Sequence, residues 1–167
     1  MSELNLRALQ APLKEQYRAD PNSAKVTLKA TGAAGAGVTC SVQNGQALLQ
    51  AGLHPATGGN GLSLCSGNML LEALVSCAGV TLGAVANSLG IALRSATITA
   101  EGDLDFRGTL AVSKDAPVGF TAIRVSFDVE TDAGNEEVAK LLRLTERYCV
   151  VLQTLKTSPE LTASRAS

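Results

Sequence analysis

One long apolar stretch, residues 66–90, constrains this chain more than any other part of its sequence. Between Lys29 and Arg94 the only charged side chain is Glu72, and it lies inside this stretch. Apolar or small residues cover nearly every face of a helix drawn through it, so no solvent-facing stripe can be identified. A helix of this kind has to be covered by a protein core, by a second subunit or by a membrane.

The two ends of the stretch carry helix signals. Ser66 or Asn68 can accept hydrogen bonds from the free N–H groups of a first helical turn, and Gly90 can take the left-handed conformation that ends a helix. Roughly 20 residues are long enough to cross a bilayer. However, the stretch lacks aromatic belts and flanking Lys or Arg residues. A core or interface helix is therefore the expectation, with a membrane span as the alternative.

The composition places the chain among soluble globular proteins. Its 167 residues most simply form one domain, with 46% hydrophobic and 17% charged residues. A net charge of −1 gives no electrostatic case for nucleic acid or for an anionic membrane, and 3% aromatic residues give no base-stacking platform. The N-terminal residues lack the basic and apolar regions of a secretion signal, so we expect a cytoplasmic protein.

Cysteine and histidine define the reactive side chains. Without a secretion signal, the four cysteines indicate free thiols in a reducing compartment; they are Cys40, Cys65, Cys77 and Cys149. No C-x-x-C pair occurs and His54 is the only histidine, so we expect neither a metal site nor a cofactor. His54 lies in a turn-rich loop, where a structural or solvated role is the simplest interpretation, although it is the only imidazole available near neutral pH.

The remaining pattern predicts antiparallel strands and an amphipathic helix. Residues 120–131 alternate apolar and polar side chains most clearly, and residues 136–148 have the spacing of an amphipathic helix. We also expect strands at 24–29, 38–42 and 94–110, a turn at 31–37 and a turn-rich loop at 52–61. The predicted organisation is an N-terminal arm at 1–23, a single domain at 24–156 and a flexible tail at 157–167.

Two cysteines carry the argument for function. Cys77 lies near the middle of the apolar helix, and Cys149 follows the amphipathic helix. The simplest interpretation is two inert core thiols. The alternative is a thiolate that attacks an electrophile, with a second cysteine that resolves the product as a disulfide. That chemistry needs a cation or hydrogen-bond donors near Cys77, because burial alone raises the pKa of a thiol.

Two motifs resemble those of the OsmC/Ohr family. The run LLEALVSCAGVTL at residues 70–82, continued by ANSLGI at 86–91, resembles the central helix of that family. The run ERYCV at 146–150, with TL at 154–155, resembles its second cysteine motif. The order of elements between them also fits, so the resemblance covers residues 24–156 approximately.

The resemblance implies a fold and a reaction. Family members are intertwined α+β homodimers with their long helices buried at the centre, which would explain a helix without a polar face. In the catalytic branches the first cysteine, here Cys77, reduces a hydroperoxide and becomes a sulfenic acid. The second, here Cys149, then forms a disulfide with it. A dithiol reductant, a lipoyl-bearing protein in some members, reopens this disulfide.

This chain differs from the active branches at two positions of that resemblance. They carry an arginine in the first glycine-rich turn, where this chain has Thr31 to Gly35, and a glutamate at the position of Gly67. The cations left to activate Cys77 are Arg147, Arg18 and Arg94. Glu72 lies five residues before Cys77, about 140° around an ideal helix, and favours the role of an acid near a helix N-terminus.

Two functions remain open after this comparison. One is thiol-dependent reduction of organic hydroperoxides by Cys77 and Cys149. The other is a non-catalytic dimer of the same fold that binds a small hydrophobic molecule. The two retained cysteines favour the enzyme, and the missing arginine and glutamate favour the binding protein. An unrelated core-helix protein with inert cysteines is the third interpretation.

Overall fold

The computed structural model describes residues 15, 19, 32–34, 39–44 and 47–165. Apart from Glu15 and Ala19, the predicted N-terminal arm lies outside the described residues, as does the strand predicted at 24–29. The chain divides into two compact units, Met1–Leu71 with Gly102–Ile123 and Glu72–Glu101 with Arg124–Ser167. The boundary crosses one helix and two strands, and each unit is described by itself below.

The first unit contains a four-stranded sheet with the strand order β1-β2-β3-β4. The strands are β1 (Gly32–Ala34), β2 (Thr39–Asn44), β3 (Ala47–Gly52) and β4 (Leu64–Cys65). β1, β2 and β3 pair antiparallel, whereas β3 and β4 pair parallel. The turn predicted at 31–37 is therefore wrong at residues 32–34, because ladder hydrogen bonds to β2 hold this small-residue segment extended despite its weak strand propensity.

The loop between β3 and β4 is rich in turns, as its glycines predict. It contains the 3-10 helix η2 (Pro55–Thr57), and Gly58 follows it with a φ of 89°. Such positive φ angles favour glycine because a Cβ atom would be strained there. The same unit holds the four-residue helix α3 (Phe106–Thr109), which the side chain of Asp105 caps by accepting from the N–H of Arg107 at 3.1 Å.

The predicted central helix is confirmed as α2 (Ser66–Leu89), and Gly90 ends it with a φ of 72°. From residue 72 onward α2 belongs to the second unit. Its buried side chains follow one face at helical spacing; they are Leu74, Ala78, Leu82, Val85 and Ala86. The opposite face stays exposed, with Val80 at 76% of its full accessibility. The described residues therefore cover only part of the apolar surface of α2.

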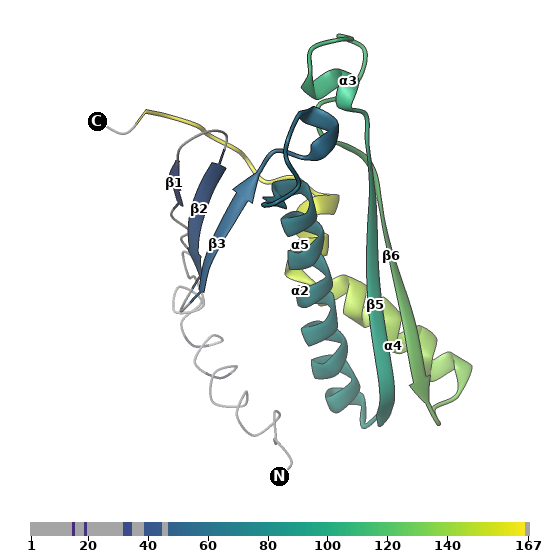
Figure 1. The fold of residues 1–167 in the computed structure, drawn as a ribbon. Coiled ribbons are helices and arrows are strands. Elements are labelled where there is room, and N and C mark those ends of the chain that lie inside the picture. The colour runs from purple at the N-terminus through teal and green to yellow at the C-terminus, as the bar shows by residue number, and fades with distance from the viewer. Residues whose placement is uncertain (1–14, 16–18, 20–31, 35–38, 45–46, 166–167) are drawn as a thin grey trace. The chain divides into compact units, whose positions relative to one another are not determined.

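Two long strands complete the fold, β5 (Leu93–Leu104) and β6 (Phe120–Thr131), which lie side by side in Figure 1. They run antiparallel, because the hydroxyl of Thr131 donates to the carbonyl of Ala92 at 2.7 Å and the hydroxyl of Thr121 donates to that of Asp103 at 3.1 Å. The strand predicted at residues 120–131 is confirmed at both of its ends.

The predicted amphipathic helix is confirmed as α4 (Asn135–Tyr148). The carboxylate of Glu137 accepts from the N–H of Gly134 at 3.0 Å, which satisfies a free donor at the start of the helix. Leu141 of α4 packs with the buried face of α2 and with partly buried strand residues such as Ile98 and Phe127. Each such leucine contributes about 1.5–3 kcal/mol of burial free energy, so this cluster anchors the second unit.

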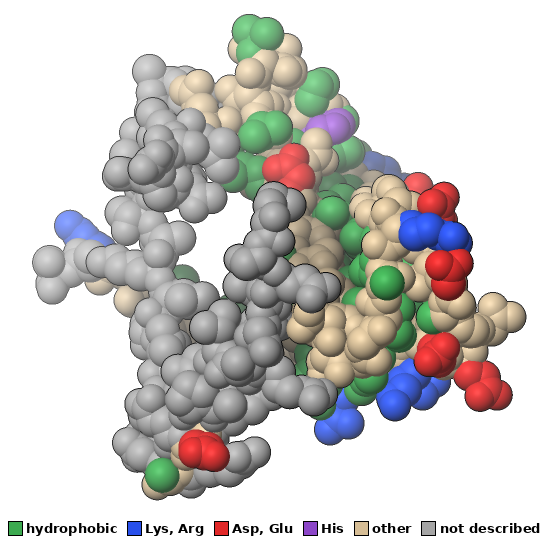
Figure 2. Space-filling model, turned by 90° about the horizontal axis from the view of Figure 1, so that it is seen from below, with side chains coloured by type: hydrophobic (Ala, Val, Ile, Leu, Met, Phe, Trp, Pro, Cys, Tyr) green, Lys and Arg blue, Asp and Glu red, His purple; other side chains and the backbone are tan. Residues whose placement is uncertain are grey.

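By length and composition alone, α2 is the one helix of the described residues that could cross a membrane. Its buried face, however, forms the core cluster of the second unit together with Leu141. On the face of the protein drawn in Figure 2, cationic and anionic side chains are interspersed. This arrangement is that of a core helix in a soluble protein.

Candidate active site

The candidate site lies where α2 meets a break between two helices of the second unit. α4 ends at Tyr148 and α5 (Val150–Lys156) begins one residue later, with Cys149 between them in an extended conformation at ψ 106°. The N–H of Cys149 still bonds to the carbonyl of Thr145 at 2.9 Å. The backbone bends at Cys149, and the first N–H groups of α5 have no intrahelical acceptor.

Those N–H groups are directed to the sulfur of Cys77. Cys77 is half-buried on α2, and its sulfur accepts hydrogen bonds from the backbone N–H groups of Val151 and Val150. The thiol of Cys149, which is fully buried, donates to the same sulfur. The hydroxyl of Thr81 also contributes a hydrogen bond to it. Two backbone N–H groups and one thiol therefore donate to this sulfur atom, and the hydroxyl of Thr81 adds the smallest contribution.

These contacts shift the two thiols in opposite directions. Burial is the largest single influence on Cys77 and opposes its ionisation, but the hydrogen bonds to its sulfur together outweigh it, so its pKa is lowered. Burial is the largest influence on Cys149 and raises its pKa; the N–H groups of Leu152 and Val151 lower it, the adjacent Cys77 sulfur raises it, and the net pKa is raised. Cys77 therefore ionises first, while Cys149 keeps its proton and donates it in a hydrogen bond.

This arrangement has the parts of a two-cysteine redox site. A thiolate, not a thiol, is the nucleophile toward peroxides and disulfides. The second thiol is already in contact with the first, and a disulfide requires Cα atoms within about 7 Å. The geometry therefore permits attack by Cys77 followed by disulfide formation with Cys149.

Among the described residues, the other candidates interact with groups other than the two thiols. The guanidinium of Arg147 lies over the ring of Tyr148, 5.6 Å from its centroid. Arg94 forms an ion pair with Asp132 at 2.9 Å, and Arg18 lies outside the described residues. Glu72 is exposed in the second turn of α2, where its carbonyl accepts from the hydroxyl of Ser76 at 2.8 Å. The structure thus brings together Cys77 and Cys149.

The sequence analysis did not identify the hydrogen-bond donors near the sulfur of Cys77. Thr81 lies four residues after Cys77, a spacing that places both side chains on one face of a helix, and this signal was available. Its hydroxyl also donates to the carbonyl of Cys77 at 2.7 Å. The N–H groups of Val150 and Val151 had no such signal, because neither glycine nor proline marks the helix break at Cys149.

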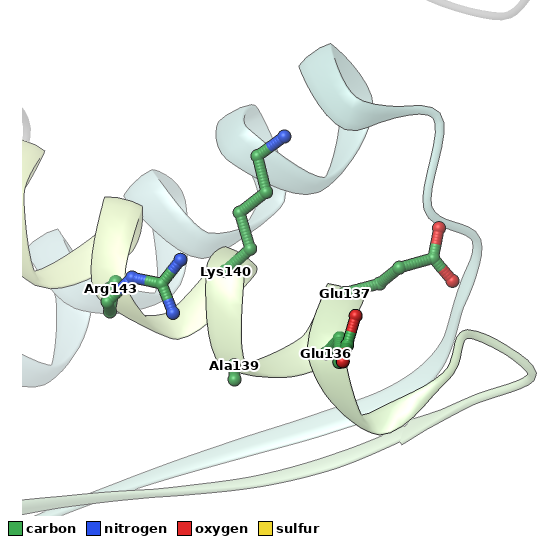
Figure 3. Close-up of a pocket in the computed structure, with 5 residues that line it drawn as sticks. All are labelled: Glu136, Glu137, Ala139, Lys140 and Arg143. Atoms are coloured by element: carbon green, nitrogen blue, oxygen red, sulfur yellow. The ribbon is translucent and has the colours of Figure 1, made fainter.

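A hollow of about 430 Å³ lies on the exposed side of α4. It is lined by Glu136, Glu137, Ala139, Lys140 and Arg143. Figure 3 shows that its charged side chains extend in different directions from the helix and do not converge on one point. The carboxylate of Glu137 is already committed to the N–H of Gly134. This hollow therefore has the character of an ordinary charged helix surface.

The structure thus combines an α+β fold with two thiols beside each other at a helix junction. Residues 58–164 match the family model for the OsmC-like protein, and the chain belongs to this family. No curated protein matches the chain. An OsmC-like protein from Mycoplasma pneumoniae has a similar solved structure, at 13% identity and a TM-score of 0.68 over 80% of this chain and 90% of that one.

Two further solved structures have the same fold. An organic hydroperoxide resistance protein from Elizabethkingia anophelis, crystallised with thiocyanate, is 14% identical over 80% of this chain and 92% of its own, with a TM-score of 0.64. A putative organic hydroperoxide resistance protein from Vibrio cholerae, with captopril in one of its active sites, is 19% identical over 81% and 89%, with a TM-score of 0.58. At these identities the likeness establishes the fold.

Proposed function

We propose that this protein reduces organic hydroperoxides, with Cys77 as the nucleophile and Cys149 as the resolving thiol. The observation that carries the proposal is the contact between the two thiols, with the pKa of Cys77 lowered and that of Cys149 raised. The family membership supports a peroxide-related role, as does the fold that the chain shares with organic hydroperoxide resistance proteins.

The proposed cycle has three balanced steps. The Cys77 thiolate attacks the terminal oxygen of the hydroperoxide, the O–O bond breaks, and the alkoxide leaves and takes up a proton to become an alcohol. The sulfur is then a sulfenic acid. The sulfur of Cys149 attacks it, the S–O bond breaks, and water leaves with the thiol proton. An external dithiol finally reduces the Cys77–Cys149 disulfide and is itself oxidised to a disulfide.

The apolar surroundings of the site favour an organic substrate. Val150 and Val151 follow the resolving cysteine, and the side chain of Val150 is exposed beside the site. A carbon chain gains about 25 cal/mol for each Å² of apolar surface that it buries against such residues. Hydrogen peroxide has no apolar surface to bury, so a bulky hydroperoxide is the preferred substrate in this proposal.

We further propose a cytoplasmic homodimer formed through the exposed face of α2. This face has small or apolar residues at alternating spacings of three and four; they are Ala73, Ser76, Val80, Gly83 and Asn87. Small residues at this spacing let two helices approach closely. A stable dimer would bury more than about 2,000 Å², and light scattering that gives a monomer at micromolar concentration would contradict this proposal.

A non-catalytic binding protein is the competing function. Gly67 favours it, because the active branches of the family carry a glutamate there. A thiol without catalytic assistance would be only slightly ionised at neutral pH. The donors around the Cys77 sulfur favour the enzyme instead, because they stabilise the thiolate without an acid or a cation.

Stopped-flow oxidation separates these functions. The reduced protein is mixed with cumene hydroperoxide or hydrogen peroxide, and sulfenic acid and disulfide are followed by fluorescence and by mass spectrometry. Cys77→Ser should abolish turnover. Cys149→Ser should permit one oxidation of Cys77 and then stop, while Cys65→Ser serves as the matched control with unchanged turnover. Oxidation of Cys77 no faster than that of a free model thiol would reject the enzyme.

A further inference from the structure

The first unit contains a cavity that the proposed peroxide chemistry does not use. Its volume is about 170 Å³, and it is lined where the start of α2 meets the ends of β5 and β6. Its wall is mainly apolar, with Leu71, Phe106 and Phe120, and the polar side chains on it are His54, Cys65 and Asn68. No Lys, Arg, Asp or Glu is among the described residues that line it.

The imidazole in this wall is held in one orientation and one tautomer. Nδ1 of His54 accepts a hydrogen bond from the N–H of Ala56 at 3.1 Å. The ring also stacks on Phe106, with centroids 4.9 Å apart and planes 16° from parallel. Because Nδ1 is an acceptor, the neutral ring carries its proton on Nε2. His54 therefore keeps one N–H donor, at Nε2, and its other ring nitrogen is already committed.

Two glycines shape the space between the aromatic rings. A Cβ atom at Gly102 would lie 2.4 Å from Cε1 of Phe120, so only glycine lets this ring lie against β5. At Gly67 a Cβ atom would lie 3.4 Å from Cζ of Phe120 and 3.6 Å from Sγ of Cys65, which are ordinary contact distances. A methyl group at position 67 would therefore enter the cavity without a clash, and glycine leaves that volume open.

We propose that this cavity is a binding site for a compact, neutral and mostly apolar molecule that has one acceptor oxygen. A monocyclic or short branched ketone or alcohol has this chemistry. An apolar cavity of about 150 Å³ in another protein is large enough to bind benzene, so the volume here fits one small ring. The N–H at Nε2 of His54 hydrogen-bonds the oxygen of the ligand, and the absence of lining charges excludes ionic ligands. This site does not depend on Cys77 or on peroxide reduction.

The test compares cyclohexanone with methylenecyclohexane, which has the same shape but no acceptor oxygen. Binding to the full-length, reduced, 15N-labelled protein is measured by NMR titration. We expect the ketone to bind about five-fold more tightly, since it alone accepts a hydrogen bond from His54. Saturating ketone should also slow alkylation of Cys65 by iodoacetamide and leave the alkylation of Cys77 unchanged. Cys77→Ser should bind the ketone as the wild type does.

Two variants locate the ligand. Gly67→Ala fills the cavity and should weaken both compounds by about ten-fold or more, and its melting temperature is measured beside that of the wild type. Loss of binding at an unchanged melting temperature cannot be attributed to unfolding. His54→Asn keeps a side chain that can cap η2, and it should remove the preference for the ketone. Unchanged binding by Gly67→Ala, shifts confined to residues outside the first unit, or no binding by the wild type would each overturn the proposal.

Discussion

Two regions of this molecule hold a partly accessible thiol, and they differ in where the polar groups come from. At Cys77 the sulfur accepts from the first N–H groups of a helix and from a second thiol. At Cys65 the neighbours are a glycine, apolar side chains and an imidazole whose Nδ1 is already committed to Ala56. The same functional group is therefore placed beside free donors in one region and beside a closed, mostly apolar wall in the other.

The difference shows that the surroundings of a cysteine determine its chemical role. A thiol becomes a nucleophile where donors stabilise its charged form. Helix N–H groups are fixed and carry no side chain that must be ordered, so they act without a cation. A thiol in an apolar wall contributes shape and weak polarity instead. This contrast predicts redox chemistry at Cys77 and ligand binding next to Cys65.

The largest expected effect is selective pairing under mild oxidation. One equivalent of cumene hydroperoxide should join Cys77 to Cys149 completely, because the two thiols are already in contact. Cys65 and Cys40 should stay open to alkylation. Peptide mapping by mass spectrometry measures all four residues in one sample. A disulfide that involves Cys65, or the absence of any disulfide, would contradict the contrast between the two regions.

The next largest effect comes from deleting one backbone donor. Val150→Pro removes the N–H of the first residue of α5, a position where proline is tolerated, and Cys149 already has the extended conformation that a residue before proline requires. The pKa of Cys77 should rise, and its reaction rate at neutral pH should fall about three- to ten-fold. Val150→Ala, which keeps the N–H, should react as the wild type does.

The pH dependence gives this test its sign. Only the thiolate reacts, so the rate of Cys77 rises with pH through its pKa and then levels off. The lowered pKa places this rise below that of a free cysteine, and Val150→Pro should move it to higher pH. Alkylation of Cys77 with iodoacetamide, followed by peptide mass spectrometry, measures the profile. A profile that does not change in Val150→Pro would show that the N–H of Val150 is not a stabilising donor.

Much of the fold could be predicted because its pattern is local. α2 was marked by a long run without charge and by Gly90, and β6 by strict alternation. β1 could not be predicted, since its glycine and alanine residues form a strand only through pairing with β2. The two faces of α2 look equally apolar in the sequence, so its division into a buried and an exposed face depends on packing against Leu141.

The candidate site was predictable in its cysteines but not in their surroundings. The motifs around Cys77 and Cys149 indicated that these two cysteines act together. Charged side chains such as Arg147 were the only activating groups that the sequence suggested. Backbone N–H groups occur at every residue, and only the helix break at Cys149 frees those of α5. No sequence pattern marks this break. The N–H donors of α5 could therefore be identified only from the structure.

A smaller effect is expected from the hydroxyl of Thr81. It has one proton, which it donates to the carbonyl of Cys77 at 2.7 Å and shares with the sulfur. Thr81→Val keeps the shape and removes this donor, so the pKa of Cys77 should rise and its oxidation should slow about two- to three-fold. Thr81→Ser should restore the rate of the wild type. An equal loss in both variants would indicate a packing role for the methyl group instead.

The smallest effect is expected at the two charged residues first considered as activators. The guanidinium of Arg147 lies over Tyr148, and the carboxylate of Glu72 is on the exposed side of α2, so neither adds to the hydrogen bonds that the sulfur of Cys77 receives. Arg147→Ala and Glu72→Gln should each change the oxidation rate less than about two-fold, as surface charges act weakly through solvent. Stopped-flow rates in low and high salt measure this. A ten-fold loss in Arg147→Ala that also disappears in high salt would mean that a cation, and not the N–H groups of α5, activates Cys77.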